Sequence, residues 1–283
     1  MTKKVKIISD STSDLSPELY EKYGVTVIPL TVSLGDQAYL DGVTVHPGQL
    51  YDHYTRTKTL PKTAAPTPAD FEQEFRKWTA DGYAVVCFTI SSEFSASYAN
   101  AHIAAGGLED VYIVDSRNLS TGVGLLVVRA AEWAAAGMSA AEIFDRIEGL
   151  KSQVEASFII NTLEFLWRGG RCSGVAALGA NMLRLKPCIE VTDGKMVVGR
   201  KFRGNLTDCI THYIRTRLEN RTDIDTARIF ITHSGMTDPH DIEAALAAVR
   251  KYQHFDEILV THAGCTVCSH CGPNTLGVLF IRK

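Results

Sequence analysis

Two short apolar runs near the start of the chain constrain the fold more than any other feature. Residues 5–8 and 25–32 are rich in Val, Ile and Thr, a composition typical of buried strands. Between them, Ser16 and Pro17 form a helix-start signal, with a capping serine before a proline at the first helical position. Strand, helix and strand in this order make a βα unit, which predicts a parallel sheet.

The first half of the chain continues this alternation. Residues 84–90 and 111–116 are further short apolar runs, each followed by a helical pattern. The helix expected over residues 122–136 is apolar on nearly every face, apart from Arg129 and Glu132. A helix of this kind is buried, either as a core helix or as the wall of an apolar tunnel.

A hairpin signal in the second half changes the pattern. Asp193 and Gly194 separate two strand-like runs and are typical of a type I′ turn, which returns the chain antiparallel. We therefore predict an α/β protein of two domains. Residues 1–150 form a Rossmann-like parallel sheet with helices, and residues 151–283 form an α/β domain with a mixed or antiparallel sheet.

Serines follow the apolar run at residues 84–90. Four of them, Ser91, Ser92, Ser95 and Ser97, precede or begin an expected helix at residues 96–105. Hydroxyls beside free helix N–H groups suit an anion, because those amides lack partners and carry the positive end of the helix dipole. The alternative is that Ser91 or Ser92 only caps the helix.

Charge argues against general nucleic-acid binding, since the net charge is −3. The charge is uneven, however, because residues 168–203 hold eight basic side chains against two acids. The basic residues are Arg168, Arg171, Arg184, Lys186, Lys195, Arg200, Lys201 and Arg203. This window is either a solvated face or a docking site for a phosphate or an acidic partner.

The expected location is a reducing cytoplasm. No apolar run approaches the roughly 18 to 20 residues that a membrane span needs. The first residues lead directly into a strand, so we expect no signal peptide. Seven cysteines, an odd number spread along the chain, do not suggest a disulfide framework.

Three C-terminal cysteines raise the possibility of a metal. Cys265, Cys268 and Cys271 have two-residue gaps, which resemble part of an iron–sulfur run, and His262 or His270 could complete a zinc site. The alternative is that they are small buried hydrophobic residues. The chain has no phosphate loop, no nucleophile elbow and no H-E-x-x-H pair, so the common enzyme motifs are missing.

The order of several short motifs resembles the DegV family. They are Ile8-Ser9-Asp10-Ser11-Thr12 with Asp14, Thr63 with Pro66, Ile90-Ser91-Ser92 with Ser95 and Tyr98, Asp115-Ser116, Leu163-Glu164-Phe165-Leu166 before Gly169-Gly170-Arg171, Lys186-Pro187, Arg203-Gly204, and His270-Cys271-Gly272-Pro273 with Leu276-Gly277. The resemblance covers nearly the whole chain. It implies a two-domain α/β fold that buries a fatty acid in an apolar tunnel at the domain junction.

The resemblance also implies roles for individual residues. Thr63, Ser92 and His270 would hold the carboxylate of a long-chain fatty acid, with no cofactor. The protein would do no chemistry alone, because a separate ATP-dependent fatty acid kinase would phosphorylate the carboxylate. Arg171 and Arg203 would dock that kinase or balance the negative charge of the phosphate. Transient contact with a membrane would allow the fatty acid to be loaded.

Three positions depart from the family pattern. Ala64 and Ala65 replace a serine and a glutamine, and Glu93 stands where a glycine is common. Glu93 would repel a carboxylate unless its side chain points outward. The competing hypothesis is a metal- or redox-linked protein that uses the Cys265, Cys268 and Cys271 cluster on the same scaffold.

Overall fold

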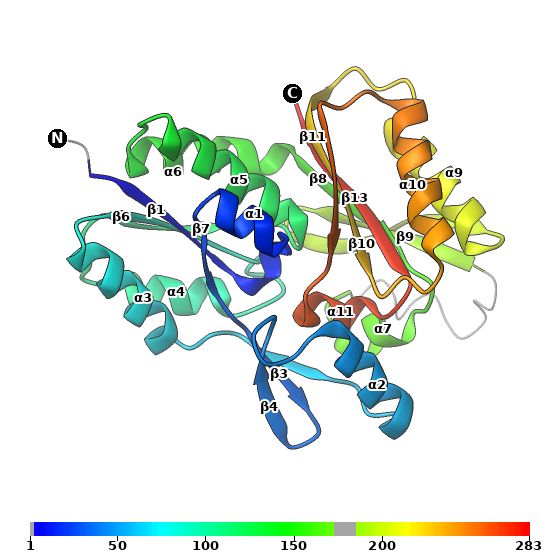
Figure 1. Cartoon of the computed structure of the whole chain (residues 1–283), viewed down its shortest axis with the longest axis horizontal. Coiled ribbons are helices and arrows are strands. Elements are labelled where there is room, and N and C mark those ends of the chain that lie inside the picture. The colour runs from blue at the N-terminus through cyan, green and yellow to red at the C-terminus, as the bar shows by residue number, and fades with distance from the viewer. Residues whose placement is uncertain (1–2, 173–184) are drawn as a thin grey trace.

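The structure, a computed structural model, describes residues 3–172 and 185–283. Within these ranges the strands form three sheets (Figure 1). The first sheet has the order β2-β1-β6-β7, and all its strands are parallel. Its strands are β1 (Val5–Asp10), β2 (Thr26–Ile28), β6 (Ala84–Thr89) and β7 (Val111–Asp115). The predicted parallel sheet is confirmed.

Helices cover both faces of the first sheet. On one face α3 and α4 pack through Phe71, Phe75 and Ala101, and on the other α5 and α6 pack through an aliphatic core (Figure 1). The bounds are α1 (Pro17–Lys22), α3 (Pro68–Ala80), α4 (Ser97–Ala105), α5 (Thr121–Ala135) and α6 (Ala140–Leu150). Thr67 caps α3 and Ser139 caps α6, each in a capping box with the acid three residues on.

The second sheet is mixed, as the hairpin signal predicts. Its order is β10-β9-β8-β13-β11-β12, in which only β11 and β12 pair in parallel among the described strands. The strands are β8 (Val154–Ile159), β9 (Leu185–Thr192), β10 (Lys195–Arg203), β11 (Ile224–Ser234), β12 (Glu257–His262) and β13 (Thr275–Arg282). Asp193 and Gly194 both have positive φ, as a type I′ turn requires.

Helix α5 lies between the two large sheets. Helices α9 (Leu206–Leu218) and α10 (Pro239–Tyr252) cover the outer face of the second sheet, and α5 contacts strands β8 and β13 on the inner face. One core cluster joins residues of α5 with Phe230 and Leu279 of the second sheet. Because α5 contacts a sheet on either side, it is apolar on nearly every face. It is a core helix.

A smaller layer lies beside the two large sheets (Figure 1). A three-stranded antiparallel sheet has the order β4-β3-β5, and α2, α7 and α11 lie near it. The bounds are β3 (Thr31–Leu34), β4 (Gln37–Leu40), β5 (Lys62–Ala64), α2 (Pro47–Thr57), α7 (Glu164–Gly169) and α11 (Cys265–Cys271). Short 3-10 turns follow β1 at Ser11–Ser13 and α6 at Lys151–Gln153.

One predicted strand is wrong. Residues 25–32 form two strands, β2 and β3, which belong to different sheets. Pro29 lies at the break, and it lacks the N–H group that a continuous ladder needs. The chain uses this interruption to leave the parallel sheet for the smaller layer.

The division into residues 1–150 and 151–283 stays a prediction. Residue 150 ends α6, directly before the short turn that leads to the first strand of the second sheet. Among the described helices, none is long and apolar enough to cross a membrane.

Candidate functional site

Helix α11 is held at its start by two acids from the first half of the chain. The Asp14 carboxylate accepts a hydrogen bond from the Gly264 amide at 2.8 Å. The Asp41 carboxylate accepts from the amides of Cys265 at 2.7 Å and Thr266 at 3.0 Å. These first-turn amides have no partner inside the helix, and their end of the dipole favours a negative charge. The acids therefore fix the position of α11.

Both acids belong to a buried cluster that also contains Asp10. Burial raises the pKa of Asp10 to about 6 and that of Asp14 to about 8, and for Asp14 the neighbouring acids add to this rise. Hydrogen bonds from Thr12 and Ile90 to Asp10 oppose the shift. Because these carboxylate oxygens accept from groups of the protein itself, the cluster is a structural anchor.

His270 lies at the other end of α11 and contacts Thr63 of β5. The Thr63 hydroxyl and the His270 Nε2 atom are 2.9 Å apart, a hydrogen-bond distance. The other ring nitrogen, Nδ1, is buried and has no hydrogen-bond partner in the described residues. It faces Gly169, where an added Cβ would lie 2.5 Å from it. The structure thus brings together two of the three residues predicted to bind a carboxylate.

The environment keeps His270 uncharged at neutral pH. Burial lowers the pKa of its imidazole to about 4, and the positive charge of Arg171 contributes to the same shift. Arg171 is positioned by bonds from its guanidinium to the backbone oxygens of Gly169 and Phe94. An anion that binds near Thr63 and His270 would therefore meet hydroxyl and imidazole donors close to a fixed positive charge.

A cavity of about 230 Å³ opens beside this pair. Its wall is mainly apolar, with a few polar side chains at one place, which is the usual make-up of a small-molecule site. The lining residues are Leu30, Thr63, Ala64, Ala65, Ile90, Phe94, Ser95, Ala96, Leu119, Arg171, Met196, Thr266, Val267, His270 and Cys271.

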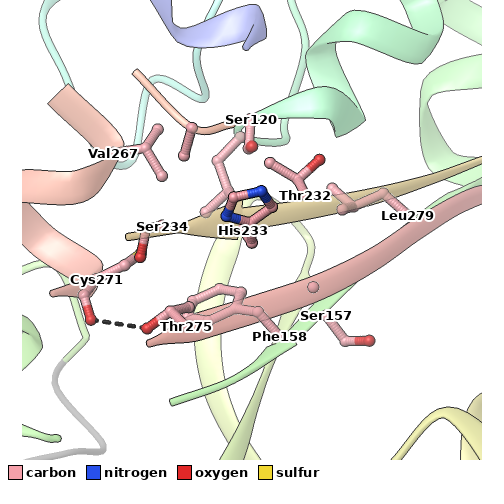
Figure 2. Close-up of a pocket in the computed structure, with 13 residues that line it drawn as sticks. Ser120, Ser157, Phe158, Thr232, His233, Ser234, Val267, Cys271, Thr275 and Leu279 are labelled. Carbon is pink, nitrogen blue, oxygen red and sulfur yellow. Dashed lines mark hydrogen bonds between the residues drawn. The ribbon is translucent and has the colours of Figure 1, made fainter. Parts of the chain in front are cut away.

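A second, narrower cavity of about 30 Å³ shares Leu119, Val267 and Cys271 with the first. Figure 2 shows it between α11 and strands β11 and β13. Phe158 and Leu279 supply apolar surface, and the Thr275 hydroxyl already donates to the Cys271 carbonyl at 3.0 Å. The two cavities are therefore neighbours, and the smaller one extends toward the second sheet.

Ser92 lies apart from the pair. Its hydroxyl donates to Asp115 at 2.6 Å and accepts from Arg117 at 3.2 Å, and the residue is exposed. It is not among the residues that line the cavity. The structure therefore does not bring Ser92 together with Thr63 and His270, the other two residues expected to bind the carboxylate. The strand end turns this hydroxyl toward the neighbouring strand β7, where Asp115 is a strong acceptor.

The neighbours of Ser92 hold the β9–β10 turn. Ser91 donates to the Gly194 carbonyl at 2.8 Å, and Arg117 donates to the Asp193 carbonyl. The predicted capping role of Ser91 or Ser92 is wrong, because α4 begins at Ser97 with Ala96 as its cap residue. These contacts join the loop after the first sheet to the hairpin of the second.

Glu93 points away from the cavity. It is exposed and forms ion pairs with Arg117 at 3.3 Å and Lys195 at 3.6 Å. The carboxylate of Glu93 is therefore paired with cations at the surface and does not oppose an anion beside His270.

The three C-terminal cysteines are buried on α11. Burial raises the pKa of each thiol, to about 12 for Cys271, so the thiolates that bind metals are disfavoured. The thiols of Cys265 and Cys268 face the backbone oxygens of Val45 and Ala263. In residues 3–172 and 185–283, no group of three or more His, Cys, Asp or Glu side chains could hold a metal. No observation favours the metal or redox hypothesis.

The two arginines expected to meet the kinase or the phosphate lie in different places. Arg171 lines the cavity, whereas Arg203 is exposed at the end of β10. Arg184 lies outside the described residues.

Sequence reasoning missed two polar residues that line the cavity, Ser95 and Thr266. Ser95 is in the serine segment, where composition alone does not distinguish one hydroxyl from another. Thr266 precedes His270 by four residues, a spacing that places both on one face of a helix. That signal is visible only if the cysteine-rich segment is interpreted as helical.

These features define a class of protein: an α/β fold with a mainly apolar cavity that ends at a hydroxyl–imidazole pair. The chain belongs to the DegV family, since a family model described as an uncharacterised protein of the DegV family matches residues 4–283.

Known proteins of this family are similar to the chain over nearly its full length. A DegV domain-containing protein of Deinococcus radiodurans is 33% identical over 280 residues, with 97% of each chain covered. A solved DegV family protein of Thermus thermophilus, described as binding fatty acid, is 30% identical with a TM-score of 0.89, and the match covers 99% of this chain and 100% of that one. A stearic-acid-binding protein of Eubacterium ventriosum is 27% identical with a TM-score of 0.85, covering 99% and 98%.

Proposed function

We propose that this protein is a fatty-acid carrier. It buries a long acyl chain in the mainly apolar cavity and holds the carboxylate at Thr63 and His270. The observation that carries the proposal is the 2.9 Å contact between these side chains at the end of a mainly apolar cavity. The fatty acids that the Thermus thermophilus and Eubacterium ventriosum relatives are described as binding support it.

The chemistry of the cavity suits both ends of such a ligand. A chain of about 16 methylenes gains roughly 13 kcal/mol gross when it leaves water, at about 0.8 kcal/mol each. The loss of freedom on association offsets a large part of that gain. A carboxylate is buried at low cost only where it accepts hydrogen bonds. The Thr63 hydroxyl can donate one if His270 Nε2–H donates to its oxygen.

The protein presents its ligand to a separate ATP-dependent fatty acid kinase and does no chemistry alone. The kinase phosphorylates the carboxylate to give an acyl phosphate. Arg171 lines the cavity beside His270, so its charge is placed to balance the phosphoryl group. The exposed Arg203 is available to the partner.

Ligand identity is tested by denaturing the purified protein and analysing the organic extract by mass spectrometry. We expect one long-chain fatty acid per chain. An extract without acyl chains, together with no saturable binding of added palmitate, would refute the carrier function.

The kinase step is tested separately. Palmitate-loaded protein is incubated with ATP alone or with ATP and a purified fatty acid kinase, and acyl phosphate is trapped with hydroxylamine. We expect hydroxamate only when the kinase is present, and less of it with Arg171→Ala. Hydroxamate formed with ATP alone would show that the protein is itself an enzyme.

A further inference from the structure

A threonine hydroxyl beside the site has no partner. Thr266 is 5% exposed, and its Oγ1 atom is buried without a hydrogen bond in the described part of the chain. Other buried polar atoms lack partners, but among the described residues only Thr266 and His270 combine this feature with a place in the wall of the larger cavity. Buried hydroxyls are usually paired, so this one needs an explanation.

The start of α11 explains why Thr266 has no local partner. A threonine or serine inside a helix commonly donates to the carbonyl four residues earlier, as Ser269 does to Cys265 at 2.7 Å. For Thr266 the corresponding residue is His262, which lies in β12 before the helix begins. Its hydroxyl therefore has no acceptor within α11, although the residue lines the cavity.

Helix geometry places Thr266 on the same face of α11 as His270. Thr266 and His270 are four residues apart on α11, so they are neighbours on one helix face, with Cβ atoms about 5–6 Å apart. Two groups at this separation can each bond a different oxygen of one carboxylate. The anchoring of α11 by Asp14 and Asp41 fixes both side chains together.

We infer that Thr266 is a ligand-contacting residue, whose hydroxyl donates to the second carboxylate oxygen of the bound fatty acid. The inference rests on the proposed function. It makes Thr266 the third carboxylate-binding residue, in place of Ser92, for which the family resemblance implied that role.

The test compares Thr266→Val, which keeps the shape and removes the hydroxyl, with Thr266→Ser, which keeps the hydroxyl. Each variant and the wild type are titrated with palmitate and with 1-hexadecanol, which has the same chain and no carboxylate. Hydrogen bonds to charged groups predict that Thr266→Val binds palmitate about 10- to 100-fold more weakly. Thr266→Ser should stay within about threefold of the wild type, and hexadecanol binding should be unchanged within about threefold in both variants.

Thermal unfolding of the ligand-free protein excludes a purely structural role. Removal of an unpaired hydroxyl should leave the midpoint of Thr266→Val unchanged or raise it, because no internal hydrogen bond is lost. A lower midpoint, an equal loss for palmitate and hexadecanol, or unchanged palmitate affinity would overturn the inference while the carrier function stands. If the wild type itself fails to bind palmitate, the proposed function fails and the inference with it.

Discussion

Binding of an anion beside His270 should become tighter as the pH falls. Burial and Arg171 lower the pKa of the free imidazole to about 4, so it is neutral at pH 7. An opposite charge placed within about 4–6 Å raises the pKa of a base by about 1–3. With a rise of about 2, the complex takes up a proton between pH 7 and pH 5, and affinity increases about tenfold, or about 1.4 kcal/mol.

The assay needs a ligand that does not titrate itself. Hexadecyl sulfonate keeps its charge over this range, so its dissociation constant at pH 7, 6 and 5 reports on the protein alone. His270→Gln keeps a polar side chain that cannot be protonated, so its affinity should change less with pH than that of the wild type, with the buried Asp10 still titrating in this range. A flat profile in the wild type, or the same slope in His270→Gln, would refute the reasoning.

The folded state must be checked at each pH, because the same histidine affects stability. A histidine whose pKa is lowered to about 4 in the folded protein stays neutral there, while in the unfolded chain it binds a proton below about 6.5. Its contribution to stability is thus lost as the pH falls from about 6.5 toward 4. Denaturant midpoints measured in parallel separate this loss from binding.

Three further changes test other parts of the site. Ser92→Ala should leave palmitate affinity within about twofold, because its hydroxyl faces Asp115, and should cost about 1.5 to 3 kcal/mol of stability for a bond to a charged group; a tenfold weaker titration would return Ser92 to the carboxylate-binding residues. Asp41→Ala should lower the free energy of unfolding by about 2–4 kcal/mol in urea, because two amides of α11 lose their acceptor, whereas the exposed Asp36→Ala should stay within about 0.5 kcal/mol; equal effects would contradict the anchor. Cys271→Phe adds bulk to a side chain that lines both cavities and should favour shorter chains in a chain-length series, with about fourfold weaker binding per excluded methylene; an unchanged preference would place the acyl chain elsewhere.

Local periodicity predicted much of the fold, because many elements depend on short-range patterns. The helices expected over residues 96–105 and 122–136 are α4 (Ser97–Ala105) and α5 (Thr121–Ala135), each within one residue of the expected bounds. The split of residues 25–32 was missed because both halves are equally apolar. The two-sheet surroundings of α5 were also invisible, since its uniform apolar faces fit a core helix and a tunnel wall alike.

The candidate site was predicted only in part, because its members are distant in the sequence. Thr63 and His270 are 207 positions apart, and only the family resemblance connected them. The sequence alone does not distinguish Ser92 from Ser95, because both are serines of the same segment. Their roles differ because the end of β6 turns one hydroxyl toward Asp115 and places the other in the cavity wall.

The anchoring of α11 also has a consequence for synthesis of the chain. Asp14 and Gly264 are 250 positions apart, so their hydrogen bond cannot form until the chain from Asp14 to Gly264 has left the ribosome. Contacts of such long sequence separation form late in folding, after the local βα units. A nascent chain therefore has apolar surface but no completed carboxylate site.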